Sequence, residues 1–120
     1  MTLGMRYTRI YNDDDSTRFE DDELSFASAA FAPPAPPIDV TTAVLAQEML
    51  LIRFSAGWSD AAHPAPARQW MFVLSGRGES TAGGETRQWG AGDVFLLEDT
   101  APPGHGTTIH EDTVMAVVRL

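Results

Sequence analysis

The chain contains three histidines, His63, His105 and His110, and imidazoles are the side chains best suited to proton transfer near neutral pH. It contains no cysteine. It also contains no lysine, since all eight basic residues are arginine. This composition excludes disulfides, thiolate nucleophiles, cysteine-based zinc sites and Schiff-base chemistry through a lysine side chain. We expect His63 and His105 to be the catalytic groups, acting as general acid or base. His110 stands beside two acidic residues and is expected to be a turn residue.

Strand geometry predicts which other side chains share a pocket with these histidines. Alternate residues of a strand point to the same face, so Gln69, Met71 and Val73 are expected on one inner wall. Trp58 lies shortly before His63 and is expected either to cap a ligand or to pack at the rim. An arginine in the preceding apolar run is a candidate clamp for a carboxylate. The expected ligand-binding residues are therefore Gln69, Met71, Val73, Trp58 and Arg53.

Short β-prone runs separated by turn signals predict that these residues are held by an all-β sandwich or barrel. Gly83–Gly84 predicts a two-residue hairpin turn. The one candidate helix is Thr41–Glu48, which has a good N-cap residue but is short. The expected strands are residues 5–11, Glu48–Ser55, Arg68–Leu74 (ended by Ser75–Gly76), 77–82, 85–89, Val94–Leu97, 105–110 and 113–119, with a turn near Glu111–Asp112 between the last two.

The first third of the chain differs in composition from the rest. Residues 1–39 are predicted to form an acidic and proline-rich arm, and residues 40–120 a barrel domain. Four prolines between positions 33 and 37 force an extended path. The outward side chains of the strand that starts near Gln69 are large and apolar, so they require a cover. That cover is either the arm of the same chain or a second subunit, and we expect a homodimer.

Charge and hydropathy exclude several classes of partner. The net charge is −9, which argues against nucleic acid and anionic membranes, since both bind basic surfaces. No run approaches the roughly 20 apolar residues of a membrane-spanning helix. The N-terminus lacks the apolar segment of a signal peptide, so the cytoplasm is the expected compartment. The acidic cluster before position 24 is expected to be a solvated surface.

Two stretches resemble the paired motifs of the cupin family. In the first, five residues separate Gly57 from His63 and six separate Gln69 from Gly76, as in the family's motif of Gly, His-x-His, Glu and Gly. Ala65 stands where that motif has its second histidine, and Gln69 where it has glutamate. The second stretch runs from Gly92 to His105 and resembles the Gly, Pro-x-Gly and His motif with about two extra residues. The asparagine that follows in the family falls on Ile109.

The resemblance covers roughly residues 45–120 and implies a jelly-roll barrel, the double-stranded β-helix of cupins, with an extended N-terminal arm. It also implies a divalent metal held by His63, Gln69 and His105, with Zn, Ni, Fe or Mn as candidates. Two imidazoles and a neutral amide are a poor set for Fe(II) or Mn(II), which prefer a carboxylate. A metal-free pocket is the alternative.

Two hypotheses of function follow. In the first, the lumen binds a small organic molecule and catalyses proton-transfer or metal-assisted chemistry on it. In the second, the chain is a binding or sensor module that holds a small ligand without turnover. The composition and the motifs do not decide whether the protein is an enzyme.

Overall fold

The computed structural model describes residues 4–120, and within this range the backbone forms strands and loops but no helix. None of these residues belongs to a helix long and apolar enough to cross a membrane. The strands are β1 (Gly4–Asp13), β2 (Ser16–Ser25), β3 (Ala27–Ala29), β4 (Ile38–Val40), β5 (Glu48–Phe54), β6 (Gln69–Ala82), β7 (Glu85–Gly90), β8 (Val94–Leu97) and β9 (Gly106–Arg119).

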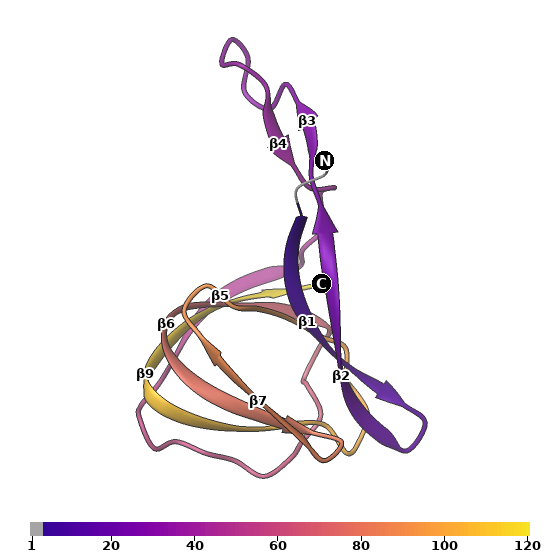
Figure 1. Cartoon of the computed structure of the whole chain (residues 1–120), viewed down its shortest axis with the longest axis vertical. Helices are drawn as coiled ribbons and strands as arrows, with labels where there is room; N and C mark the ends of the chain where they lie inside the picture. The colour runs from indigo at the N-terminus through magenta and orange to yellow at the C-terminus, as the bar shows by residue number, and fades with distance from the viewer. Residues whose placement is uncertain (1–3) are drawn as a thin grey trace.

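Seven strands form one sheet that curls around a lumen (Figure 1). The order is β2-β1-β8-β6-β9-β5, and β7 pairs with the far half of β6. The strands β6 and β9, each of 14 residues, pair antiparallel along most of their length and form the centre of the sheet. The remaining two strands, β3 and β4, form a separate hairpin. The all-β barrel expected from the sequence is confirmed.

At two places where the sequence predicts that a strand ends, the structure has a bent strand that continues. The register between β6 and β9 shifts three times between Val73 and Gly78, so both strands bend there without ending. The predicted turn at Glu111–Asp112 was wrong, because the two carboxylates face solvent on a continuous strand. Each is paired across the surface, Glu111 with Arg77 and Asp112 with Arg53. The strand end predicted at Ser75–Gly76 was also wrong, because β6 bends there and continues to Ala82.

The other strand predictions agree with the structure. The expected runs at Glu48–Ser55 and Val94–Leu97 correspond to β5 and β8. The β6–β7 hairpin turns at Gly83–Gly84, where both residues have positive φ, 56° and 78°. A two-residue turn with positive φ at both positions matches the twist of the flanking strands.

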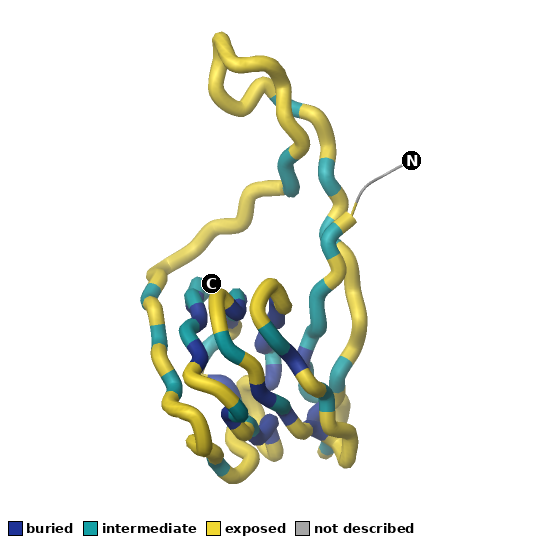
Figure 2. The backbone as a smooth tube through the Cα atoms, turned by 60° about the vertical axis from the view of Figure 1, so that its left-hand side comes forward, coloured by how far each residue is buried: buried dark blue, intermediate teal, exposed yellow. Residues whose placement is uncertain are grey.

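The predicted helix at Thr41–Glu48 was wrong. Residues 41–46 have no regular structure and β5 begins at Glu48. Most of the segment is exposed as it runs from the β3–β4 hairpin to the barrel (Figure 2). A short helix is marginal in water unless it can bury an apolar face, and this segment has no surface to pack against.

The barrel has an apolar cluster on each side of the sheet. Inward-facing side chains form the larger cluster, which includes Ile10, Trp89, Phe95 and Met115. Outward-facing Trp70, Val94 and Leu96 form the smaller cluster, against which side chains of the N-terminal hairpin pack. Tyr7 of β1 contacts Trp70 edge-on, with ring centroids 4.9 Å apart. Part of the cover expected for this outer face therefore comes from the same chain.

Residues 4–25, which the sequence predicts as part of the arm, belong to the barrel sheet. Strand β1 pairs in parallel with β8, and β2 pairs with β1 in a hairpin. Ile10 of β1 is 1% exposed and lies in the inner cluster. Residues 26–47, to which we restrict the name arm from here on, instead project away from the barrel (Figure 1).

Replacement of Ile10 by alanine tests whether β1 is part of the barrel core. Because the side chain is buried in the inner cluster, we expect Ile10→Ala to lower the free energy of unfolding by about 2–5 kcal/mol and Ile10→Val by about 0.5–1.5 kcal/mol. Chemical denaturation followed by circular dichroism measures both. If β1 were a detachable segment, neither substitution would change the unfolding midpoint of the barrel.

Candidate functional site

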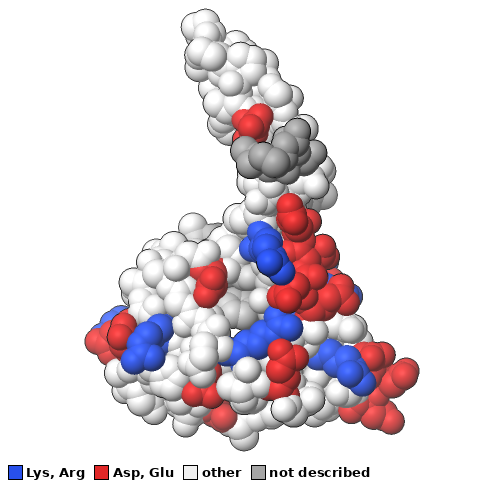
Figure 3. Space-filling model, viewed as in Figure 1, with Lys and Arg blue, Asp and Glu red and all other residues white. Residues whose placement is uncertain are grey.

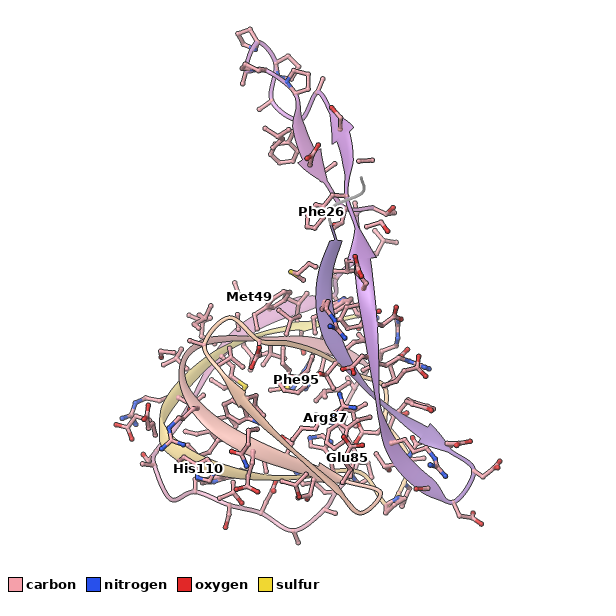
Figure 4. All side chains as sticks on the ribbon, in the orientation of Figure 1. Phe26, Met49, Glu85, Arg87, Phe95 and His110 are labelled. Atoms are coloured by element: carbon pink, nitrogen blue, oxygen red, sulfur yellow. The ribbon has the colours of Figure 1, made fainter. Side chains whose placement is uncertain are left out.

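A cavity of about 490 Å³ occupies the lumen of the barrel. Figure 4 shows side chains filling the ring of strands, Phe95 among them. The apolar wall comprises Ile10, Leu50, Ile52, Phe54, Trp58, Pro66, Met71, Trp89, Phe95, Leu97, Met115 and Val117. The polar lining consists of Asp60, His63, Gln69, Ser80, His105, Thr107 and Arg119.

His105 and Asp99 form a buried pair at the polar side of this cavity. Nδ1 of His105 lies 2.6 Å from Oδ2 of Asp99, and the carboxylate is fully buried. A carboxylate oxygen only accepts hydrogen bonds, so Nδ1 carries the proton and Nε2 is left as an acceptor. Nε2 has no hydrogen-bond partner within residues 4–120. The second oxygen of Asp99, Oδ1, is also buried without a partner among these residues.

The loop that carries this pair is fastened by the N-terminal hairpin. The backbone N–H of Glu98 donates to the carbonyl of Ile10 at 2.7 Å. The buried hydroxyl of Thr17 accepts the N–H of Gly104 at 2.8 Å. The side chain of Asn12 exchanges two hydrogen bonds with the backbone of Ala101, at 2.8 and 3.0 Å. The N-terminal hairpin therefore positions the loop that carries Asp99 and leads to His105.

Gly104 permits the close approach of two chain segments beside His105. Its φ is +79°, and a Cβ at this position would lie 2.0 Å from the carbonyl oxygen of His63. His63 and His105 exchange backbone hydrogen bonds of 3.1 Å in both directions, which holds their rings 5.6 Å apart. The two histidines expected to converge are thus brought together.

His63 differs from His105 in that its side chain is half exposed, at the rim of the cavity. Its Nδ1 lies 2.9 Å from the carbonyl of Pro64, and its Nε2 lies 2.6 Å from Oδ2 of Asp60. Both partners only accept, so the ring makes both bonds as an imidazolium. The Pro64 carbonyl raises the pKa of His63 above its usual value, and Asp60 adds to this against the opposing effect of burial. The other oxygen of Asp60 accepts the N–H of Thr107 at 2.7 Å.

Gln69 lies in the cavity wall on β6, at the inner position expected for it. Its Oε1 faces Nε of Arg119, 3.4 Å away, across the β6–β9 pairing. Nη1 of Arg119 donates to Glu48 at 2.7 Å. Ala65, at the position of the second motif histidine, is 3% exposed and packs in the inner cluster.

Of the remaining predicted ligand-binding residues, two line the cavity, one is packed in the core and one points to the exterior. Met71 and Trp58 line the cavity. Val73 faces inward but is packed in the core at 3% exposure and lies outside the cavity lining. Arg53 points to the exterior, where it binds Asp112 at 3.1 Å, because it follows the inward Ile52 and the strand alternates.

Three functional side chains were not assigned to the site from the sequence. Asp60 precedes His63 by three residues in a loop, where no strand period indicates its direction. Asp99 precedes Thr100 in a loop, where the sequence pattern is equally typical of a residue that builds a turn through side-chain to backbone hydrogen bonds. Arg119 had an available signal, because it faces the cavity with the same alternation as Met115 and Val117.

A second cleft of about 370 Å³ lies on the surface between β1, β7 and β8. Two of its charged groups are paired with each other, since Arg87 binds Asp21 at 2.7 Å. The lumen is the stronger candidate because it combines a large apolar wall with a free imidazole nitrogen.

The protonation of His63 has a measurable consequence. Its pKa is raised in the folded chain, so the stability it contributes is complete below the unfolded value of about 6.5 and is lost as the pH rises through the folded pKa. An NMR titration should place the pKa of His63 above that of an exposed histidine. Asp60→Asn should lower it while keeping the acceptor for Thr107. An unchanged pKa in Asp60→Asn would contradict the pairing.

Comparisons with known proteins place the chain in a family. The family model described as the cupin domain matches residues 50–119. No curated protein matches the chain. Similar solved structures include a Streptococcus pyogenes protein of unknown function, SPY1581, with 19% identity over 67% of this chain and 68% of that one, at a TM-score of 0.49. An RmlC-like cupin from Desulfovibrio desulfuricans has 13% identity over 97% and 81%, at 0.45.

A third similar structure is a putative ethanolamine utilization protein Q from Salmonella typhimurium, with 13% identity over 99% of this chain and 96% of that one, at a TM-score of 0.46. The family match covers more than half of the sequence, including His63, Gln69 and His105. The chain belongs to the cupin family.

Proposed function

We propose that the lumen binds a small organic molecule with an apolar body and one proton-donating group, and that Nε2 of His105 accepts the proton of that group. The observation that carries the proposal is the buried Asp99–His105 pair at the edge of an apolar cavity. A volume of about 490 Å³ lies within the usual range of small-molecule pockets, about 300–1,000 Å³.

The Asp99–His105 pair supports a general-base role. The hydrogen bond to Asp99 fixes both the tautomer and the orientation of the ring, which presents its lone pair on Nε2. When Nε2 takes a proton, the buried carboxylate faces the positive charge that forms on the ring. Such positioned bases accelerate proton transfer by about 10²–10⁴-fold.

The apolar wall supports recognition of the ligand body. Aromatic and aliphatic side chains line the cavity from six strands, so an apolar ligand is removed from water on several sides. The imidazolium of His63 and the carboxylate of Asp60 neutralise each other at the rim. Nε2 of His105 therefore offers a ligand an unpaired acceptor, and that acceptor selects an O–H or N–H donor.

The donor set does not suit a resident divalent metal. Within residues 4–120, no three His, Cys, Asp or Glu side chains are grouped closely enough to hold one. Ala65 supplies no ligand atom, and the amide of Gln69 is neutral and faces the guanidinium of Arg119. Both ring nitrogens of His63 are hydrogen-bonded, so of the four ring nitrogens of His63 and His105 just Nε2 of His105 has no partner in the described part of the chain. One imidazole and one amide are a poor set for Zn, Ni, Fe or Mn.

Binding without turnover is the second candidate function. It is favoured by the hydrogen bonds of His63, which engage both of its ring nitrogens and leave His105 as the single free proton-transfer group. A site that accepts a proton but has no second group to deliver one holds a ligand more readily than it converts it.

Naphthol and its methyl ether test the proposed binding mode, because they share an apolar body and differ in the O–H group. We expect naphthol to bind about two- to tenfold more tightly, the equivalent of one hydrogen bond of roughly 0.5–1.5 kcal/mol. His105→Ala should abolish this preference. Titrations followed by NMR spectroscopy measure both affinities.

The matched control is His110→Ala, which removes an imidazole that pairs with Glu79 outside the cavity lining. It should keep the preference for naphthol. Equal affinities for the two probes in the unmodified protein, no binding of either, or a preference that survives in His105→Ala would each refute the proposed role of His105.

Elemental analysis tests the proposal that the site works without a resident metal. Protein purified without a metal-affinity tag and then incubated with Zn, Ni, Fe or Mn should retain far less than one metal per chain after dialysis, because the donor set is incomplete. Near-stoichiometric metal that is lost in a His63→Ala, His105→Ala double variant would contradict this expectation.

A further inference from the structure

Arg119 brings a positive charge into the lumen. Of the eight arginines, it alone belongs to the lining of the cavity. Others, such as Arg53 and Arg77, are paired with carboxylates at the surface. Figure 3 shows this pattern on one face of the molecule, where blue arginines lie against red acidic side chains. A chain with a net charge of −9 thus keeps one guanidinium in its cavity, and this group is well suited to hold an anion.

The backbone of Arg119 is held on both sides, so its side chain starts from a fixed position. Its carbonyl accepts the N–H of Gln47 at 2.8 Å, and the following N–H, of Leu120, donates to the carbonyl of Arg68 at 3.0 Å. The side chain is 34% exposed, so water screens its charge only in part. The guanidinium is therefore a positioned element of the cavity wall.

Arg119 and Gln69 together leave N–H donors without a partner. Nε of Arg119 donates to Oε1 of Gln69 over 3.4 Å, and its Nη1 donates to Glu48 at 2.7 Å. Nη2 of Arg119 has no hydrogen-bond partner among residues 4–120, and neither has the amide nitrogen of Gln69, whose side chain is 5% exposed. Both groups only donate. The complement of such a charged donor set is a carboxylate, which only accepts.

The acidic side chains around the lumen leave these donors to a ligand. Glu48, the acid bound to Arg119, is 57% exposed and is not part of the cavity lining. Asp60 and Asp99 are each hydrogen-bonded to one of the two histidines. Within the described part of the chain, no carboxylate therefore reaches Arg119 from inside the cavity.

The donors lie beside the segment that carries the proposed base. Gln69 pairs with Leu97 across β6 and β8, and Asp99, the partner of His105, follows Leu97 by two residues. Gln69, Arg119 and His105 all line the same cavity. One ligand in the lumen can therefore meet the donors and the base together.

We propose that the ligand of the lumen is an organic acid, and that Arg119 and the amide of Gln69 bind its carboxylate. This inference rests on the proposed function, because the same molecule carries the O–H or N–H group that meets Nε2 of His105. The ligand class is therefore an apolar acid with a separate hydroxyl or amino group. The carboxylate clamp that the sequence predicts at Arg53 is assigned to Arg119, which determines specificity for the acid.

Naphthoate and its methyl ester test the carboxylate site, because they share an apolar body and differ in charge. Neither has an N–H or O–H group for His105 at neutral pH. We expect the unmodified protein to bind naphthoate about tenfold more tightly, since hydrogen bonds to a charged group are stronger than neutral ones. Arg119→Gln should abolish this preference, whereas His105→Ala should keep it. Titrations followed by NMR spectroscopy measure the affinities.

The matched control is Arg53→Gln, which removes the same charge from the exterior, where Arg53 binds Asp112. It should keep the preference for naphthoate, although its net charge equals that of Arg119→Gln. Circular dichroism checks the fold of both variants. Arg119→Gln should also keep the preference for naphthol over its methyl ether, which shows that the lumen is intact.

Glu48→Gln tests the site with Arg119 in place, and so does not depend on whether Arg119→Gln folds. It keeps an acceptor for Nη1 but removes the exposed carboxylate that competes with the ligand for the guanidinium. The affinity for naphthoate should rise about two- to fivefold, the equivalent of one exposed ion pair. Glu111→Gln, which removes a carboxylate paired with Arg77 at the surface, should leave this affinity unchanged.

The results separate this inference from the proposed function. Equal affinities for naphthoate and its ester, a preference that survives in Arg119→Gln, or one that is lost in Arg53→Gln would each overturn the carboxylate site, even with naphthol still preferred over its ether. An unchanged affinity in Glu48→Gln would overturn it as well. A preference for naphthoate with none for naphthol would support the carboxylate site and refute the role of His105. No binding of any probe would overturn both.

Discussion

The hydrogen bond between the buried carboxylate of Asp99 and Nδ1 of His105 is the interaction on which the site depends. Placing a carboxylate at 0% exposure is costly unless a cationic or donor group faces it. Asp99 has one such partner, and its second oxygen has none within the part of the chain that the structure describes. The N–H at Nδ1 of His105 is the group that compensates this carboxylate for its loss of hydration.

This constraint explains why the surrounding structure is arranged as it is. The carboxylate stays buried because three hydrogen-bonded contacts from the N-terminal hairpin hold the loop that carries it. On the other side, the backbone of Ala65 donates to the carbonyl of Asp99 at 2.9 Å. The small side chain of Ala65 fills the core where the family motif has a histidine. At this position the site therefore has a backbone hydrogen bond from a loop residue in place of a second imidazole.

Much of the barrel could be predicted from the sequence, because period-two alternation and glycine turns are local signals. The hairpin at Gly83–Gly84 and the inward positions of Gln69 and Met71 follow from such signals. The bends of β6 and β9 could not be predicted, since a bulge keeps a strand continuous through residues that locally favour a turn. The pairing of β1 with β8 is also beyond local signals, because it joins residues nearly 90 positions apart.

The site was predictable in its histidines but not in its carboxylates. The spacing of the motifs identified His63 and His105, and the structure places their ring centroids 5.6 Å apart. Asp60 and Asp99 lie in loops, where the direction of a side chain is set by contacts distant in the sequence. Arg53 was assigned to the lumen, and the alternation of β5 turns it outward.

The protonation of the His105 ring is the most direct measure of the central claim. Nitrogen NMR shifts of an imidazole distinguish a proton on Nδ1 from a proton on Nε2. With Asp99 as the acceptor, neutral His105 should carry its proton on Nδ1, and addition of naphthol should shift the Nε2 signal. A proton found on Nε2 would contradict the account, because His105 would then offer a ligand a donor and no acceptor.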